Sequence, residues 1–182
     1  MKSKKTVNFG ENVNVGEGVA IARSPYSKRV GFTCGAFDLL HAGHSLMLQE
    51  AREQCDHLIV GVQSDPSIDR ADKNAPIQSY EERIAMVRSI RYVDEVVMYD
   101  TENDLLELLK KINPDVRIVG ADWKGKKYTG YELEINVHFN KRDHGWSTSN
   151  LRERVYLAER DKRKTCSVET ADLHQRDKLG IP

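Results

Sequence analysis

Residues 29–51 read RVGFTCGAFDLLHAGHSLMLQEA, and this stretch decides the fold. It passes from a short apolar run through a turn that contains Gly35 and Gly43 into a sequence with helical character. The unpaired amide groups at a helix start carry a partial positive charge, so they stabilise an anion without a cationic side chain. Neither glycine presents a Cβ, so the backbone can approach such a ligand closely. The stretch therefore predicts a phosphate-binding turn between the first strand and the first helix of the domain.

Two histidines stand at this helix start. His41 and His44 are three residues apart, so both imidazoles can point the same way and donate hydrogen bonds to one group. A transferring phosphoryl group gathers charge on its oxygens, so such donors stabilise the transition state more than the ground state. A lone histidine in this place is more often a cap or a partly exposed side chain, and HxxH can be half of a metal site. The joint pattern G-x-F-D-x-x-H-x-G-H after an apolar strand favours the phosphate site.

Beyond this turn, short apolar runs alternate with amphipathic stretches, which is typical of a parallel sheet joined by crossover helices. Strands are expected near 30–34, 58–62, 95–98, 116–119 and 135–139, and helices near 43–54, 79–90, 103–112 and 149–164. In the last helix, Leu151, Val155 and Leu157 are the expected buried positions. Right-handed crossovers then give an α/β, Rossmann-like, doubly wound and mainly parallel five-stranded sheet flanked by helices. Ligands bind such sheets at the carboxyl ends of the strands.

Three segments are predicted along the chain: an N-terminal arm at 1–28, the main domain at 29–164 and a polar, loosely ordered tail at 165–182. The arm carries a short hexapeptide-like repeat that aligns Val7 with Val13. Three hexads make at most one coil of a β-helix, which cannot bury its own face without stacking on something else. An extended or hairpin arm, packed on the domain or on a partner subunit, is the favoured interpretation.

Composition limits the partners. The 182 residues suit one domain with tails, and 28 Lys and Arg balance 28 Asp and Glu. No net field then attracts nucleic acid or an anionic membrane, so neither is an expected partner and phosphate recognition must be local. Cys34, Cys55 and Cys166 form neither a disulfide framework nor a zinc spacing, which favours a reducing compartment. With no apolar stretch at the start to serve as a signal peptide or span, we expect a cytoplasmic protein.

Several separated blocks resemble the cytidylyltransferase family of HxGH nucleotidyltransferases, and most closely its glycerol-3-phosphate cytidylyltransferases. The resemblance covers about residues 30 to 155, with order and spacing in agreement. The blocks are GAFDLLHAGH, SDPS, SYEER, IRYVDEV, VGADWKGK and RDHGWSTSNLR. It implies a nucleotidyltransferase domain in which a phosphorylated acceptor attacks the α-phosphate of a nucleoside triphosphate.

The resemblance also implies roles. His41 and His44 would stabilise the α-phosphate, and Asp38 would hold Mg²⁺ or orient a histidine, with helix capping as the alternative. Mg²⁺ would neutralise phosphate charge and make pyrophosphate a better leaving group. Lys73 lies in a loop where family members carry basic residues that reach the nucleotide phosphates, and Arg142 completes the expected catalytic set.

The remaining expected site residues fall into two sets. The resemblance implies nucleotide contacts from Gly35, Ala36, Phe37, Gly43, Asp122, Trp123, Ser147 and Thr148. The last two hydroxyls can cap the final helix as well as bind phosphate. Acceptor contacts are expected from Asp65, Arg83, Arg91 and Asp94, since guanidinium groups suit phosphate oxygens. Surface pairing of the arginines with Glu81, Glu82 or Asp94 is the alternative.

The expected enzyme is therefore a CTP:phospho-alcohol cytidylyltransferase. It would transfer CMP from CTP to a phosphorylated alcohol such as glycerol 3-phosphate, release pyrophosphate and act as a homodimer. Ala36 replaces the usual Thr, Ser or Cys of the family, while Asp143 and Trp146 replace Thr and Ile or Cys. The segment KGKKYTGYELEI carries a YTG that resembles heptose-phosphate adenylyltransferases. An adenylyltransferase acting on a sugar phosphate is thus the alternative, followed by a non-catalytic nucleotide-binding module.

Overall fold

The structure is a computed structural model that describes residues 28–179, with side chains described as far as residue 164. The predicted arm lies outside the described residues except for its last position. The described elements are, in chain order, β1 (Val30–Gly35), α1 (Ala42–Glu53), β2 (His57–Gln63), α2 (Tyr80–Arg88), β3 (Glu95–Tyr99), α3 (Glu102–Ile112), β4 (Val116–Gly120), the 3-10 helix η1 (Ala121–Trp123), β5 (Asn136–Asn140) and α4 (Thr148–Leu179).

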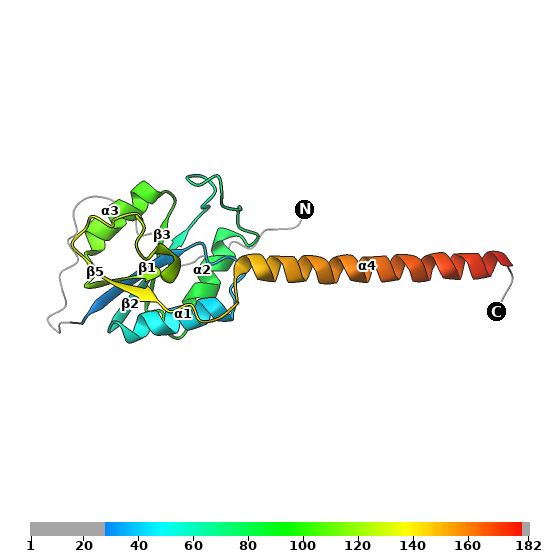
Figure 1. The fold of residues 1–182 in the computed structure, drawn as a ribbon, viewed down its shortest axis with the longest axis horizontal. Helices are drawn as coiled ribbons and strands as arrows, with labels where there is room; N and C mark the ends of the chain where they lie inside the picture. The colour runs from blue at the N-terminus through cyan, green and yellow to red at the C-terminus, as the bar shows by residue number, and fades with distance from the viewer. Residues whose placement is uncertain (1–27, 180–182) are drawn as a thin grey trace, which may run out of the picture.

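The five strands form one sheet in the order β3-β2-β1-β4-β5, and every neighbouring pair is parallel (Figure 1). The chain builds outward from β1 to β3 and then crosses back to β4 on the other side of β1. This reversal places a topological switch point at the carboxyl ends of β1 and β4, where ligands of doubly wound sheets bind. The predicted fold class is confirmed.

Apolar clusters cover both faces of the sheet, as parallel sheets require. On one face, α1 and α2 contribute Leu48 and Val87, which pack with Val60 of β2. On the other face, Leu105 and Leu109 of α3 pack with Phe32, Ile59 and Tyr99. Capping boxes at Ser79 and Thr101 start α2 and α3, because each side chain accepts from the third helical amide. The helix starts, and with them the loops of the carboxyl edge, are therefore fixed locally.

Helix α4 corrects the expected tail. It continues from Thr148 to Leu179 instead of ending near residue 164, and it extends away from the domain (Figure 1). Val155 and Leu157, expected to be buried, are 58% and 36% exposed. The stretch contains neither Gly nor Pro before residue 180 and is rich in Lys, Arg, Glu and Leu, so helix propensity alone favours its continuation. The missing apolar periodicity reflects the exposure of Val155, Tyr156 and Leu157, beyond the first turns that contact Asp38, and it does not mean loss of helix.

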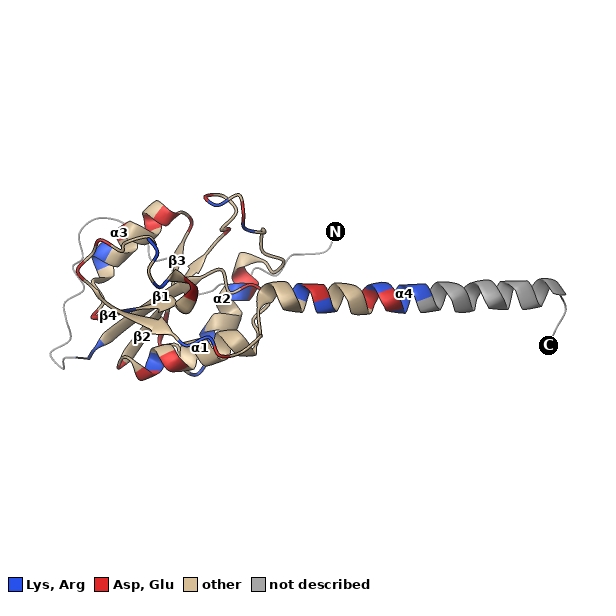
Figure 2. Cartoon of the chain, viewed as in Figure 1, with Lys and Arg blue, Asp and Glu red and all other residues tan. Residues whose placement is uncertain are grey.

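Charged side chains of both signs follow one another along the described part of α4 (Figure 2). Arg163 and Glu159, one helical turn apart, form an ion pair at 2.9 Å. Within the described part of the chain, no helix is both long enough and apolar enough to span a membrane.

Candidate active site

The predicted phosphate turn lies where β1 ends and α1 begins. Phe37 and Leu39 hold left-handed backbone angles, with φ of 52° and 48°, which residues with a Cβ rarely adopt. The buried ring of Phe37 anchors the turn from within, and Gln78 accepts a 2.7 Å hydrogen bond from the Leu39 amide. Surrounding structure therefore holds the turn in a costly conformation, a feature that clusters at functional sites.

The two histidines cap α1 together. His41 Nδ1 accepts from the Gly43 amide at 3.1 Å, and His44 Nδ1 accepts from the His41 amide at 3.4 Å. The rings stack with centroids 4.0 Å apart. A neutral imidazole whose Nδ1 accepts carries its proton on Nε2. Both rings therefore present an Nε2–H donor, and Nε2 of His41 lies 3.4 Å from the Thr148 hydroxyl.

Both imidazoles are neutral near pH 7. Burial lowers the pKa of His44 to about 4, and the neighbouring His41 adds to this effect. Burial also lowers the pKa of His41, followed by the positive charges of His144, Arg142 and Arg154. The pair supplies directed hydrogen-bond donors and no net charge, so cations for a phosphate must come from elsewhere in the site.

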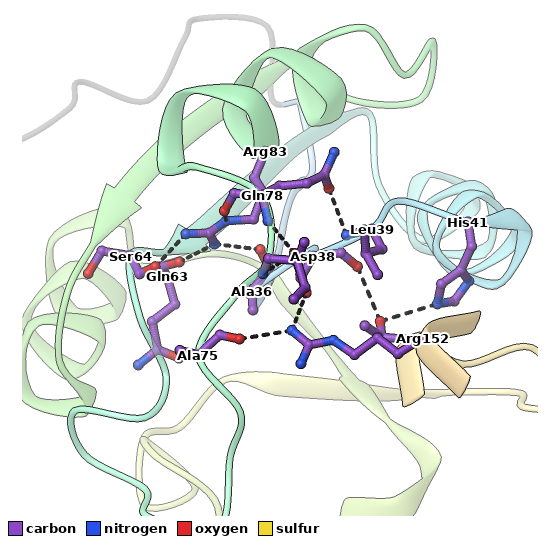
Figure 3. Close-up of polar contacts among 12 residues, drawn as sticks. Ala36, Asp38, Leu39, His41, Gln63, Ser64, Ala75, Gln78, Arg83 and Arg152 are labelled. Atoms are coloured by element: carbon purple, nitrogen blue, oxygen red, sulfur yellow. Dashed lines mark hydrogen bonds and ion pairs between the residues drawn. The ribbon is translucent and has the colours of Figure 1, made fainter. Parts of the chain in front are cut away.

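Asp38 joins three segments beside the histidines (Figure 3). One carboxylate oxygen accepts from the amides of Ile77 and Gln78, each at 3.0 Å. The other accepts from Arg152 of α4 at 2.7 Å, and Arg152 also donates to the Ala75 carbonyl at 2.8 Å. Burial alone would raise the pKa of Asp38, but the hydrogen bonds from Gln78 and Arg152 outweigh it and lower that pKa.

These contacts compete with the expected metal role of Asp38, which stays a prediction. Asp38 is 5% exposed, and its oxygens already accept from the Ile77 and Gln78 amides and from Arg152. No hydrogen bond joins it to either histidine ring among the described contacts, so it acts on them through the backbone of the turn and through its charge, which opposes the lowering of the His44 pKa. Within the described side chains, no group of three His, Cys, Asp or Glu could hold a metal ion.

The expectation that Arg83 contacts the acceptor substrate is wrong. It is 1% exposed, and its hydrogen bonds run to the backbone, so it is not available to bind the acceptor substrate (Figure 3). Its guanidinium donates to the carbonyls of Ala36 at 2.7 Å and Gln63 at 2.6 Å, and to that of Ser64. Arg83 thus joins the carboxyl ends of β1 and β2 and satisfies backbone carbonyls that would otherwise lie buried without donors.

Two other residues that were expected to bind the acceptor substrate lie at the opposite edge of the sheet. Arg91 and Asp94 precede β3, so they sit at the amino ends of the strands, opposite the phosphate turn. Asp94 accepts from the Leu58 amide at 2.8 Å and pairs with Arg52 at 3.5 Å. The guanidinium of Arg91 lies 4.9 Å from the Tyr92 ring centroid. Neither residue can reach an acceptor at the carboxyl edge.

Asp65 and Lys73 do follow β2 at the correct edge. Asp65 accepts from the amide and hydroxyl of Ser67 at 2.9 Å and 2.7 Å, which stabilises its own turn. Lys73 is exposed and pairs with Asp72 at 3.4 Å. The structure brings neither side chain into contact with the histidines, so their substrate roles stay predictions.

The loops that follow β4 and β5 close the site. Arg142 donates to Asp122 at 2.9 Å, and this bond outweighs burial to lower the pKa of Asp122. Ser147 accepts from the Asn150 amide at 3.1 Å, as a helix cap does. Thr148 donates to the Asp38 carbonyl at 3.2 Å, which ties the start of α4 to the phosphate turn.

Two cavities meet at these residues. The smaller, of about 240 Å³, is the phosphate cavity, and it is lined by His41, Gly43, His44, Asp122, Arg142, His144, Ser147 and Thr148 among others. The larger, of about 700 Å³, lies toward α3, and its lining includes Gly35, Ala36, Phe37, Trp123, Tyr99, Glu102, Arg117, Lys127 and Thr129. His44, Met47, Gly120 and Asn140 line both cavities. The expected nucleotide residues therefore surround one continuous region, with His44 at its centre.

Sequence reasoning missed three residues of this site. Arg152 ends the matched block RDHGWSTSNLR but was given no role, and Gln78 lies outside the blocks, because the roles of both depend on how α4 and the loop after β2 return to Asp38. His144 was visible inside RDHGWST, but it stands at a variable position of the family pattern and drew no prediction.

Neutral imidazole donors at the helix start of a parallel sheet, beside an arginine and a cavity, are the arrangement expected at the phosphate site of an HxGH nucleotidyltransferase. Comparison with known proteins agrees with this class. The family model described as cytidylyltransferase-like matches residues 32–154, and the chain belongs to that family of nucleotidyltransferases.

Curated relatives add detail. The chain is similar to the bifunctional protein HldE of Campylobacter curvus, with 36% identity over 162 residues, 88% of this chain and 34% of that protein. The HldE protein of Campylobacter concisus is 41% identical over 138 residues, 75% of this chain and 29% of that protein. The chain thus spans about a third of the length of these relatives.

A solved structure shares the fold. The lipopolysaccharide core biosynthesis protein from Thermoplasma volcanium aligns with a TM-score of 0.53 and 27% identity. The match covers 64% of this chain and 99% of that one.

Proposed function

We propose that this chain transfers a nucleotidyl group, preferably AMP from ATP, to the phosphate of a sugar phosphate and releases pyrophosphate. The observation that carries the proposal is the stacked, neutral histidine pair, whose Nε2–H donors stand at the phosphate turn where the two cavities meet. An oxygen of the acceptor phosphate attacks the α-phosphorus, and the bond from that phosphorus to the bridging oxygen of the β-phosphate breaks.

Groups of the chain itself orient the α-phosphate and stabilise its charge in this step. The amides at the start of α1 and the two imidazoles donate to the α-phosphate as its charge grows, which favours the transition state. Because the histidines are neutral, Arg142, which lines the phosphate cavity, supplies positive charge. Its ion pair with Asp122 is about half exposed on both sides, and exposed pairs are weak, so a phosphate can take the place of Asp122.

Mg²⁺ would neutralise phosphate charge and assist the departure of pyrophosphate. Among the described residues that line the phosphate cavity, Asp122 is the carboxylate, and it would become available when Arg142 turns to the nucleotide. Mg²⁺ commonly uses one or two carboxylates together with phosphate oxygens and water, so a single carboxylate fits this ion. Magnesium dependence and dimerisation stay predictions.

The polar lining of the larger cavity favours a sugar phosphate as acceptor. Its volume of about 700 Å³ lies within the range of ligand pockets. Glu102, Arg117, Lys127 and Thr129 provide donors and acceptors for several hydroxyls beside the tyrosine rings of Tyr99 and Tyr128. The cavity opens at His44, where the acceptor phosphate must arrive.

The comparisons support the same choice. The relatives named HldE and the lipopolysaccharide core biosynthesis protein favour adenylyl transfer to a sugar phosphate over cytidylyl transfer to glycerol 3-phosphate. The YTG segment, whose Thr129 lines the larger cavity, resembles heptose-phosphate adenylyltransferases and agrees with this preference.

Pyrophosphate release with four triphosphates against a panel of sugar 1-phosphates and glycerol 3-phosphate tests the proposal. We expect ATP with a sugar phosphate to give the highest kcat/KM. A higher kcat/KM for CTP with glycerol 3-phosphate would instead favour a CTP:phospho-alcohol cytidylyltransferase. Nucleotide binding without turnover for any pair would favour a non-catalytic module.

A further inference from the structure

A third histidine reaches the phosphate cavity from the loop between β5 and α4. The ring of His144 packs on the first turn of α1, where a Cβ built on Gly43 would lie 2.8 Å from His144 Cε1. The same Cβ would lie 3.0 Å from His41 Cε1. Glycine at position 43 therefore lets two imidazoles approach the helix start together. Trp146 supports His144 from its own loop, with ring centroids 5.2 Å apart.

The lining of this cavity favours an anion with several oxygens. His41, His44 and His144 line it together with Arg142, and its one described carboxylate, Asp122, is already paired with that arginine. His144 also lies close enough to His41 to contribute, after burial, to the lowering of the His41 pKa. The loop of His144 is thus electrostatically coupled to the catalytic pair.

One nitrogen of His144 has no partner. Its Nδ1 is buried and makes no hydrogen bond among the described residues. Buried polar atoms are nearly always hydrogen-bonded, and an exception calls for an explanation such as a function. Packing alone does not explain the residue, because a phenyl ring would fill the same space without this unpaired nitrogen.

We infer that His144 is a third phosphate-binding imidazole, which holds the β- and γ-phosphates that leave as pyrophosphate. The inference rests on the proposed function. The stacked pair of His41 and His44 serves the α-phosphate, so His144, on the same helix start but on another loop, serves the adjoining phosphates.

Pyrophosphate binding measures this contact without nucleoside or acceptor. Isothermal titration with sodium pyrophosphate, with and without Mg²⁺, compares the full chain with His144→Ala, His144→Phe and His144→Asn. Phenylalanine keeps the ring packing on Gly43 and removes both nitrogens, whereas asparagine places its amide nitrogen near the position of Nδ1. His57→Ala is the matched control, since His57 is a partly exposed histidine at the amino edge, paired with Glu95 at 3.5 Å.

We expect pyrophosphate affinity to fall about tenfold in the alanine and phenylalanine variants, as for loss of a hydrogen bond to a charged group. The asparagine variant should recover part of this loss, and the control should change less than about twofold. The melting temperature of the phenylalanine variant should equal or exceed that of the parent, because an unpaired buried nitrogen is removed.

Parent-like pyrophosphate affinity in the phenylalanine variant would overturn the inference, because it would show a packing role only. If the parent chain itself binds neither pyrophosphate nor any triphosphate, the proposed function fails instead. The two failures are therefore distinguishable.

Discussion

Replacing Arg152 by methionine tests whether Asp38 organises the site. Arg152 donates to Asp38 at 2.7 Å from the first turns of α4, and Asp38 is nearly buried. Methionine keeps a long, unbranched side chain with good helix propensity, so the variant removes the charge and the hydrogen bonds to Asp38 and Ala75 and retains the helix. Removing one partner of a buried ion pair costs about 3 to 5 kcal/mol. Asp38 retains two amide donors and Arg152 is partly exposed, so we expect about 2 to 3 kcal/mol of destabilisation.

The pH dependence of that deficit identifies its cause. The folded pKa of Asp38 is lowered, so this carboxylate stabilises the fold above its unfolded pKa of about 3.9, and the contribution is lost as pH falls through the folded value. Without Arg152 part of this contribution disappears, while the amides of Gln78 and Ile77 retain the rest. The deficit should therefore be full at about pH 7 and should shrink as the pH falls below about 4.

Urea unfolding of parent and variant, followed by the fluorescence of Trp123 and Trp146, gives both free energies. Arg160→Met is the control, because Arg160 pairs with Asp161 on the exposed part of α4 and such pairs contribute about 0 to 1 kcal/mol. A deficit for Arg152→Met no larger than that of the control would refute the anchoring role. A deficit that is constant with pH would assign the effect to packing.

Three further outcomes follow from the site. His44→Ala should reduce kcat about a hundredfold or more with an unchanged circular dichroism spectrum, since the loss falls on transition-state charge; more than a tenth of the activity remaining would count against its role. Because the pKa of His44 is about 4 and that of His41 is lowered, kcat/KM should show no acid limb near the ordinary histidine value of about 6.5; a limb there in a pH profile would contradict the neutral pair. Arg83→Met should lower the free energy of unfolding by about 2 to 4 kcal/mol in urea titrations, because several buried carbonyls lose their donor; an effect below about 1 kcal/mol would mean that water replaces the guanidinium.

The sheet and the phosphate turn were predictable because their signals are local. The inner strands β1 and β2 are mainly apolar runs, and the expected strand near 58–62 lies within β2, His57–Gln63. The turn was predictable because glycines and histidines stand at fixed spacing across a strand end and a helix start. The extent of α4 was not, because residues beyond 164 have helix propensity without an apolar face to reveal it.

The errors at the site have physical causes, and two of them were avoidable. In α2, Arg83 shares its helix face with Val87, four residues on, and both are buried, so the spacing already placed it on the inner side. Arg91 and Asp94 come just before a strand, and residues before a parallel strand lie at the edge opposite the ligand. A motif match gives the order of residues along the chain and does not give the edge or face on which they lie. The roles of Arg152 and His144 depend on loop paths that no local pattern encodes.

Neutrality of the histidine pair explains how a chain with no net charge can hold a phosphate site. Neutral donors attract no anion at a distance and act only when their N–H bonds point at the phosphate. Such a site therefore depends more on hydrogen-bond direction than on long-range electrostatic attraction. That geometry is set by the backbone of the turn from Asp38 to His44, which the Asp38 carboxylate and the Thr148 hydroxyl hold in place. Asp38 touches neither histidine ring, and yet the direction of both donors depends on it. A carboxylate matched to the catalytic motif therefore acts through the backbone it holds, and its loss should disturb the donor directions even where a metal ion is supplied in excess.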